Sequence, residues 1–396
     1  MTRTGQHQRC ISGIHWLAAS GALALGTMCV LAALGTPPAQ AQTYTVLHSF
    51  TGADGESPLG LIRDPRGDLY GVTQLGGVSG QGVVFKLDTT GETVLYSFTG
   101  GADGAYPTIG LVQDAAGNLY GTTAGGASPF GEVFKLDTTG TETVLHSFTG
   151  VGDGGEPNGL LSDAAGNLYG TTYIGGPSHH GLAFTLDTTG TETVLHNFGG
   201  LRGGNPASAL IRDADGNFYG TTWRGGSAGY GVVFKLDSTG AETVLYNFTG
   251  GADGGKPYAP LIRDASGNLY GTTSGGGINP QICRLGCGVV FKLDTTGTET
   301  VLHSFTGGAD GTNPSTGLIR DSAGNLYGTT PTGGESGWGL AFEVDTAGTE
   351  TVLYSFTGGN DGGKPEAGLI RDLAGNLYGT AIYSESGFGV VFRIAP

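Results

Sequence analysis

The chain has 396 residues, of which 79 are glycine and 13% are charged, and its formal net charge is −16. Glycine at this level without a Gly-x-y period excludes collagen, and 38% hydrophobic residues, with regularly recurring tyrosine, phenylalanine, leucine and valine, exclude a disordered chain. The negative charge disfavours binding to nucleic acid or to an anionic membrane, because like charges repel.

The first 41 residues predict an export signal. Arg3 and Arg9 precede an apolar stretch over residues 14–34, and Ala39-Gln40-Ala41 matches the small-x-small pattern of a signal peptidase site. We therefore expect residues 1–41 to be a signal peptide. A retained membrane anchor is the alternative, because the apolar stretch is nearly long enough to span a bilayer. After cleavage we expect no membrane span and a periplasmic, cell-surface or extracellular location.

Residues 42–396 consist of one unit that occurs seven times, at spacings of 48 to 57 residues. The segment VL(H/Y)(S/N)F begins at Val46, Val94, Val144, Val194, Val244, Val301 and Val352. A second segment, DxxG(N/D)(L/F)YG, begins at Asp64, Asp114, Asp163, Asp213, Asp264, Asp321 and Asp372. A period near 50 residues is typical of propeller blades.

Each unit predicts four short strands, named A to D in chain order. In the second unit they cover residues 110–114, 118–123, 131–137 and 141–148, which are β-branched and aromatic runs bounded by glycine, aspartate and asparagine. The A–B and C–D turns both combine an aspartate with a glycine, which suits tight hairpins. The pattern predicts an all-β, seven-bladed β-propeller with four antiparallel strands per blade.

The two ends of residues 42–396 predict how the ring closes. Residues 43–50 form a lone strand D, whereas the last unit stops after strand C, at residues 389–394. We expect the first strand to complete the last blade, which leaves no sheet edge unpaired, and we expect a monomer. An open solenoid is the alternative, and it would not explain why the two ends complement each other.

The recurring segments GNLYGTT, GVVFKLD and VLYSFTGGADG resemble the GloVer tandem-repeat family of exported bacterial proteins. The resemblance covers residues 44–394. It implies a propeller with a secreted or surface location, and it implies no established activity.

The B–C and D–A loops, which share one face of a propeller, are where the seven units differ. Aromatic residues recur there, just before strand C, at the end of strand B and beside the D–A prolines. The candidate ligand-binding residues are Trp223, Trp338, Tyr230, Phe388, Phe130, Tyr258, Glu366 and Asn158. Exposed rings beside polar groups suit sugars or protein partners. The alternative is that the rings cover glycine-rich backbone between neighbouring blades.

Two kinds of side chain invite a metal interpretation. Cys283 and Cys287 lie in one B–C loop, and a disulfide is expected there because a metal site would need two further ligands. Aspartates recur in the D–A loops, with Gly203 expected in the place of the missing one: Asp54, Asp103, Asp153, Asp253, Asp310 and Asp361. One carboxylate per blade does not make a calcium cage, so these residues are expected to form turns. We expect no metal and no cofactor.

The positions after the D–A prolines correspond to the channel mouth, where lactonase-like propellers bind a metal. These positions are Leu59, Thr108, Asn158, Ala207, Tyr258, Ser315 and Glu366. One carboxylate and one amide are too few for such a site, so no catalytic residue is assigned. The main hypothesis is a non-catalytic secreted or surface propeller that binds a glycan or protein through the B–C/D–A face. The alternatives are a channel-mouth hydrolase or lyase, and a purely structural envelope protein.

Overall fold

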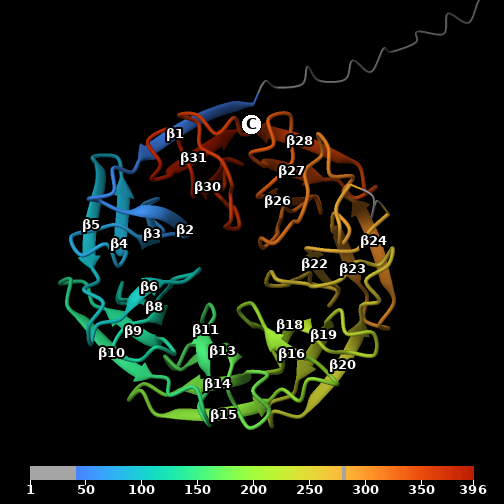
Figure 1. Ribbon diagram of the computed structural model, residues 1–396, viewed down its shortest axis with the longest axis horizontal. Coiled ribbons are helices and arrows are strands. Elements are labelled where there is room, and N and C mark those ends of the chain that lie inside the picture. Colours follow the sequence, from blue (N-terminus) through green and yellow to red (C-terminus); the bar gives the residue numbers. More distant parts are fainter. Residues whose placement is uncertain (1–41, 279–281) are drawn as a thin grey trace, which may run out of the picture. The chain divides into compact units, whose positions relative to one another are not determined.

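Short β-branched and aromatic segments, separated by glycine turns, form seven antiparallel sheets around a central axis (Figure 1). The structure is a computed structural model that describes residues 42–278 and 282–396. The expected signal peptide therefore lies outside the described residues. Within the described part of the chain, no helix is long and apolar enough to cross a membrane.

The first four blades each follow the chain from the innermost strand outward. Blade one comprises β2 (Glu56–Arg63), β3 (Leu69–Leu75), β4 (Val83–Asp88) and β5 (Gly91–Ser97). Blade two comprises β6 (Ala105–Pro107), β7 (Val112–Gln113), β8 (Leu119–Gly125), β9 (Glu132–Leu136) and β10 (Glu142–Ser147). Blade three comprises β11 (Gly155–Pro157), β12 (Leu161–Ser162), β13 (Leu168–Ile174), β14 (Leu182–Leu186) and β15 (Glu192–Asn197). Blade four comprises β16 (Gly204–Pro206), β17 (Ile211–Arg212), β18 (Phe218–Arg224), β19 (Val232–Leu236) and β20 (Glu242–Asn247).

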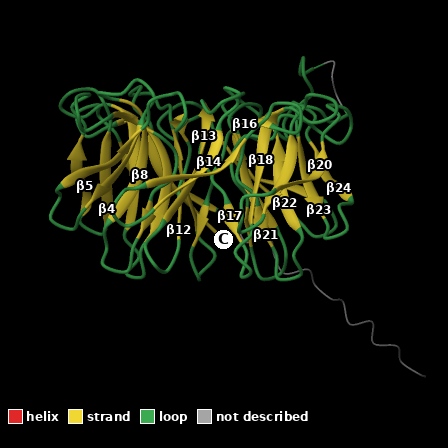
Figure 2. Ribbon diagram, turned by 90° about the horizontal axis from the view of Figure 1, so that it is seen from below, coloured by secondary structure: helices red, strands yellow, loops and turns green. Residues whose placement is uncertain are grey.

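The remaining blades have shorter inner strands. Blade five comprises β21 (Ile262–Arg263), β22 (Leu269–Thr273), β23 (Val289–Leu293) and β24 (Glu299–Ser304). Blade six comprises β25 (Ile319–Arg320), β26 (Leu326–Thr330), β27 (Leu340–Val344) and β28 (Glu350–Ser355). Blade seven comprises β29 (Ile370–Arg371), β30 (Leu377–Ala381), β31 (Val390–Ala395) and β1 (Thr43–Ser49). Figure 2 shows the strands running between two faces of loops.

The ring closes as expected, because β1 pairs antiparallel with β31. The pairing places Tyr44 opposite Ile394, and the Tyr44 hydroxyl donates a hydrogen bond to the backbone carbonyl of Asp361. Its ring also stacks on Tyr354 with 3.8 Å between centroids. The first described strand is therefore joined to blade seven by its backbone, and Tyr44 also contacts blade six and the loop that follows it.

In blades one to four the inner strand begins earlier in the chain than the sequence indicates. In blade two the expected strand A covers residues 110–114, whereas the structure adds β6, with Pro107 opposite Thr123 of β8. The prolines of the first four blades thus lie in strand segments rather than in the D–A loops. A proline is tolerated there because the innermost strand is an edge strand that faces the channel, so its missing N–H leaves no partner unpaired.

The core lies between neighbouring blades. The phenylalanine after each strand D meets the phenylalanine of strand C in the next blade edge to face, as Phe148 meets Phe184 with 5.2 Å between centroids. The pairs are Phe50 with Phe85, Phe98 with Phe134, Phe148 with Phe184, Phe198 with Phe234, Phe248 with Phe291, Phe305 with Phe342 and Phe356 with Phe392. All are almost fully buried, so each blade junction has the same aromatic core.

The A–B turns explain why an aspartate recurs in every unit. One oxygen of Asp213 accepts the backbone N–H groups of Asp215 and Asn217, and the other accepts the Asn217 amide and the Tyr219 hydroxyl. These hydrogen bonds outweigh the effect of partial burial and lower the pKa of Asp213 to about 2. Much of the acidic character of the chain is therefore structural.

Candidate functional site

Most aromatic residues that precede strand C pack on backbone. Phe130 covers Gly150 of the following D–A loop so closely that a Cβ on this glycine would lie 2.4 Å from the ring. The side chains in this position are Gln81 over Gly100, Phe130 over Gly150, His180 over Gly200, Tyr230 over Gly250, Trp338 over Gly358 and Phe388 over Gly52. This packing on glycine was the alternative interpretation of the predicted site, and it accounts for Phe130, Tyr230, Trp338 and Phe388.

In blade five a disulfide takes the place of this ring. Cys283 and Cys287 are bonded, and a Cβ on Gly307 would lie 2.8 Å from both sulfurs. The backbone carbonyl of Cys287 also accepts the N–H of Asn313, as the carbonyl of Phe130 accepts the N–H of Glu156. The disulfide therefore covers the loop glycine that an aromatic side chain covers in other blades.

These packed rings differ in accessibility. Tyr230 is 38% exposed. Trp338 stacks on Tyr383, with 4.6 Å between centroids and 16° between planes, and the Lys364 ammonium lies 5.7 Å from the Trp338 centroid. Phe130, Trp338 and Phe388 are half-buried and pack against buried core residues. Of this set, Tyr230 is the exposed ring.

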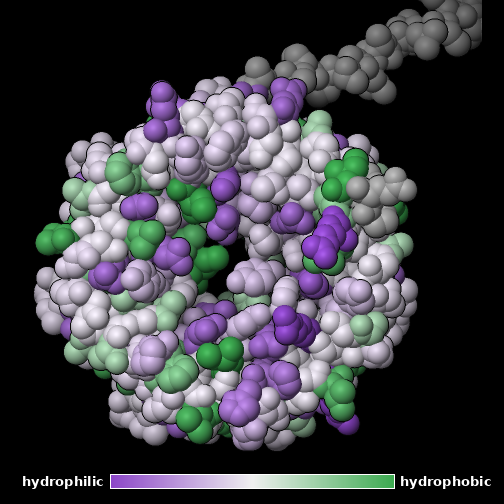
Figure 3. Space-filling model, viewed as in Figure 1, coloured by the Kyte–Doolittle hydropathy of each residue, from purple (hydrophilic) through white to green (hydrophobic). Residues whose placement is uncertain are grey.

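Trp223 is placed differently, at the end of β18. It lies under two cations, with the Arg224 guanidinium 4.5 Å and the Lys256 ammonium 4.9 Å from its centroid. Burial raises the pKa of the nearby Tyr173. The charge of Arg224 lowers this pKa, and Tyr258 raises it. Tyr173, Trp223, Arg224, Lys256 and Tyr258 thus form one group of rings and cations, here called the mouth cluster. Figure 3 shows hydrophilic side chains on this face over β16 and β18, beside the channel opening.

Tyr258 and Glu366 interact across the loop face. Tyr258 is 44% exposed, and its pKa is raised by burial of the hydroxyl and then by the carboxylates of Glu366 and Glu156. Burial likewise raises the pKa of Glu366, against the opposing effect of Lys364. The charge of Glu366 therefore acts on Tyr258, and the sequence predicted both as site residues, in blades five and seven.

Asn158 has a structural role. Its side-chain amide donates to the carbonyl of Pro206 at 2.8 Å and to the Thr171 hydroxyl at 3.1 Å. These bonds join the inner strands of blades three and four, and they use both hydrogens of the amide. A ligand would have to break one of them to bind Asn158 as a donor.

The sequence interpretation missed the residue before each D–A proline. All seven have a left-handed backbone, with φ between 53° and 57°: Ser57, Tyr106, Glu156, Asn205, Lys256, Asn313 and Lys364. Each donates its N–H to the carbonyl of the residue that precedes strand C in the previous blade, as Lys256 donates to Tyr230 at 2.7 Å. This bond holds an uncommon conformation in place while the side chain differs in most blades. The available signal was a variable residue before a recurring proline.

The D–A aspartates act as loop closures. Asp103 accepts hydrogen bonds from the backbone N–H and hydroxyl of Thr99 and from the Tyr96 hydroxyl. Within residues 42–278 and 282–396, the one group of three donor side chains close enough for a metal is His48, Asp54 and Glu92, with ligand atoms within 4.8 Å of one another. There too the aspartate accepts the N–H and hydroxyl of Thr51. The expectation that no metal binds remains a prediction.

Comparison with known proteins supports the repeat and the fold. The profile of the Gloeobacter/Verrucomicrobia repeat matches residues 34–162, 133–319 and 280–396. No curated protein matches the chain in sequence. A catalytically inactive virginiamycin B lyase from Staphylococcus aureus, crystallised with quinupristin, superposes with a TM-score of 0.62 at 12% identity, over 90% of this chain and 99% of the lyase.

A second similar structure is the extracellular domain of a hybrid two component system from B. thetaiotaomicron. It superposes with a TM-score of 0.61 at 13% identity, over 89% of this chain and 39% of that one. At these identities the likeness concerns the fold alone, because propellers of one architecture support unrelated functions.

Proposed function

The chain belongs to the Gloeobacter/Verrucomicrobia repeat family, and we propose that it is an exported, non-catalytic propeller that binds a glycan through the mouth cluster. The observation that carries the proposal is that Trp223 lies under Arg224 and Lys256, and that the exposed ring of Tyr258 follows Lys256 by two positions in the chain. Aromatic faces bind the apolar faces of sugar rings, and the surrounding cations and hydroxyls bind the sugar oxygens. Most other aromatic rings of this face pack on loop glycines, so the mouth cluster is the best candidate for the binding site.

Two features support export. Residues 1–41 have a basic start, an apolar stretch and a small-x-small site. Cys283 and Cys287 form a disulfide, and structural disulfides persist mainly in oxidising compartments. A fractionation experiment that finds the protein only in the cytoplasm, with its N-terminus intact, would contradict this part of the proposal.

A glycan array on the purified protein tests the binding site, followed by titration calorimetry with the best glycan. Trp223→Ala is expected to weaken binding by about tenfold or more, because a ring stacked on a ligand contributes on the order of 1–2 kcal/mol. Trp338→Phe, which keeps a ring over Gly358, is the matched control and should bind as the parent does. If the Trp223→Ala protein binds the glycan as tightly as the parent, the mouth cluster is not the binding site. If the protein binds no glycan and binds only a protein ligand, the proposed ligand class is wrong.

A lyase or hydrolase reaction at the channel mouth is the second candidate, because the charge of Glu366 acts on Tyr258 and the pKa of each group is raised. Metal analysis of the purified protein and a screen with lactones and polysaccharides separate the two functions. Turnover that is lost in Glu366→Gln would favour catalysis. Binding without turnover would favour the non-catalytic propeller.

A further inference from the structure

The junction between blades three and four departs from the repeat in its D–A loop. Elsewhere the loop begins with a threonine whose N–H and hydroxyl bond to the loop aspartate, as Thr249 does to Asp253. Here Gly199 and Arg202 take these two places. The Gly200 N–H donates to the Gly203 carbonyl, and in the first loop the Gly52 N–H donates to the Gly55 carbonyl in the same way. The residues before these two carbonyls therefore correspond, so Arg202 aligns with Asp54. The expectation that Gly203 replaces the aspartate is therefore wrong.

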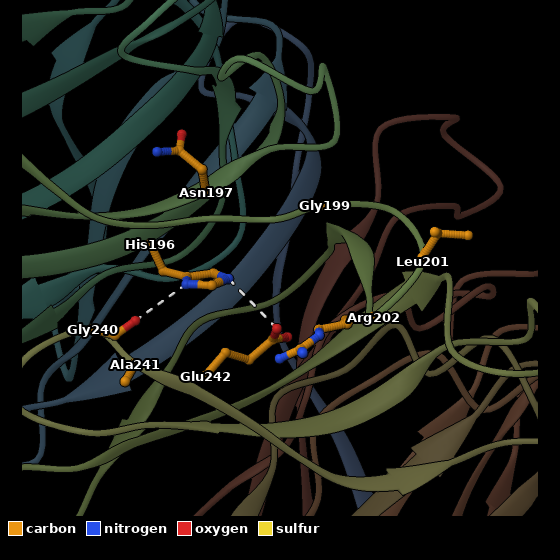
Figure 4. A pocket seen from close by; sticks show the side chains of 8 residues that line it. All are labelled: His196, Asn197, Gly199, Leu201, Arg202, Gly240, Ala241 and Glu242. Atoms are coloured by element: carbon orange, nitrogen blue, oxygen red, sulfur yellow. Dashed lines mark hydrogen bonds and ion pairs between the residues drawn. The ribbon is translucent and has the colours of Figure 1, made fainter.

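The exchange reverses the charge of the loop, and two pockets are lined by its residues. A pocket of about 420 Å³ lies between the end of β15 and the start of β20 (Figure 4). A second pocket of about 480 Å³ shares Leu201, Arg202 and Glu242 with the first and continues to Ser227 and Asn247. Both volumes lie in the range of small-molecule sites. Together they form a trough on the outer rim, which is built by other residues than the mouth cluster.

Three side chains give the pocket its chemistry. Glu242 has a side chain only 5% exposed, and its Oε1 has no hydrogen-bond partner within the described residues. Its Oε2 lies 3.7 Å from Nε2 of His196, whose Nδ1 bonds to the Gly240 carbonyl at 3.1 Å. Arg202 is exposed, and its charge lowers the pKa of Glu242 against the larger, opposing effect of burial. No salt bridge or side-chain hydrogen bond joins Arg202 to another described residue. Figure 4 shows Arg202 and Glu242 extending toward one another from two sides of the pocket.

These groups define what a ligand must offer. Arg202 presents an unused fork of N–H donors, which suits a carboxylate. Glu242 presents a buried oxygen that lacks a partner among the described residues, as the equivalent glutamates of other blades do, and here an arginine lines the same pocket. A buried acceptor without a partner is unfavourable, so a ligand hydroxyl would be stabilising there. An ammonium is a poor choice for that donor, because it would approach the Arg202 guanidinium and the imidazole of His196. A neutral hydroxyl avoids this repulsion.

We propose that this trough is a second binding site, which takes a uronate residue of an acidic oligosaccharide, with the carboxylate on Arg202 and a ring hydroxyl on Glu242. The continuation past Ser227 and Asn247 provides room for a further sugar unit, so an oligomer should bind better than a single uronate. The site goes beyond the proposed mouth site and does not depend on it.

The decisive variant restores the repeat. Gly199→Thr with Arg202→Asp rebuilds the threonine–aspartate closure of the other loops, and a Cβ on Gly199 meets no atom within 4 Å. The full-length protein and this variant are titrated by calorimetry with sodium galacturonate and with tetragalacturonate. Maltotetraose is the neutral control ligand, and glycine tests for zwitterion binding. We expect the variant to lose about tenfold or more in affinity for tetragalacturonate while its thermal stability is kept or raised.

Further variants separate this site from the mouth. Glu242→Gln should weaken tetragalacturonate binding several-fold, because an amide oxygen is a weaker acceptor than a carboxylate. The repeat-restoring variant is also compared with its parent in a Trp223→Ala background, so binding at the mouth and binding at the rim are distinguishable. The exposed Leu373→Ala, outside both sites, is the control that should bind as the parent does. The proposal is overturned by equal binding of maltotetraose, by stronger binding of glycine, by unchanged affinity in the repeat-restoring variant, or by no binding of tetragalacturonate.

Discussion

At the residue scale, the glutamate that begins strand D has the same unusual surroundings at five blade junctions. Burial, followed by the charge of a nearby aspartate, raises its pKa to about 7, and one carboxylate oxygen is buried without a hydrogen-bond partner among residues 42–278 and 282–396. These residues are Glu92, Glu142, Glu192, Glu299 and Glu350. Since the unfolded pKa is 4.5, the folded protein binds more protons between pH 4.5 and about 7. Their contribution to stability is complete below pH 4.5 and is lost as the pH rises through 7.

Replacement of Glu299 by glutamine tests this directly. Glutamine stays neutral, so Glu299→Gln should change the melting temperature little at pH 4.5 and should raise the unfolding free energy at pH 8 by on the order of 1 kcal/mol, after allowance for solvent screening at this half-buried site. Thermal melts from pH 4.5 to 8 measure the difference. The exposed Glu335→Gln is the control, because it removes the same charge outside a junction. A stabilisation that does not depend on pH would contradict the assignment.

The A–B turn aspartates act in the opposite direction. The pKa of Asp213 is lowered to about 2, so its contribution is present above its ordinary value of 3.8 and is lost as the pH falls toward 2. We therefore expect the protein to be most stable at mildly acidic pH. In that range the turn aspartates are ionised and the strand D glutamates are still protonated.

At the scale of the elements, each C–D turn joins two strands of its own blade and also contacts the previous blade. Gly240 has a φ of +82°, and a Cβ there would lie 2.0 Å from the carbonyl oxygen of Leu195 in the previous blade. The turn equivalent in blade two, Gly140, has a φ of +83° but leaves 3.5 Å to the carbonyl of Leu95. Both glycines therefore serve a left-handed turn conformation. Gly240 in addition allows the backbones of two blades to approach closely.

This pair separates backbone strain from packing. Gly140→Ala should destabilise by about 1 kcal/mol, because alanine disfavours a positive φ. Gly240→Ala should cost about 1–3 kcal/mol more, because the turn must also move away from Leu195. Chemical denaturation of both proteins gives the comparison. Equal losses would mean that the close approach at Gly240 relaxes without effect.

At the scale of the whole molecule, the ring depends on one strand from the other end of the chain. β1 pairs with β31, Tyr44 stacks on Tyr354, and Phe50 meets Phe85 of blade one. Residues 43–50 thus supply the outer strand of blade seven and one ring of the core between blades seven and one. Without them β31 would present an unpaired edge, and the junction would lose its aromatic contact.

Deletion of residues 43–50 should therefore open the ring. We expect a lower melting temperature and association through the exposed edge, seen as higher-mass species in size-exclusion chromatography with light scattering. A synthetic peptide of residues 43–50 added in trans should partly restore the monomer, which a general folding defect would not allow. A truncated protein that stays monomeric with an unchanged melting temperature would show that β1 is dispensable.

The sequence by itself determined the architecture. Strand periodicity, Asp–Gly turns and the order of strands at the two ends are local features, and their sevenfold recurrence predicts the blade number and the closure by residues 43–50. The turn role of the repeated aspartates was also accessible, because each bonds to residues within a few positions of itself.

Only the tertiary structure decided which loop residues are free to act. Phe130 and Trp338 look like binding residues until they are found over the glycines of the following loops, and Asn158 until it is found bonded to Pro206. The opposition of Arg202 and Glu242 arises where one blade meets the next, 40 residues along the chain. Local pattern carries no information on such contacts, because packing between blades, and not strand or turn propensity, brings these side chains together.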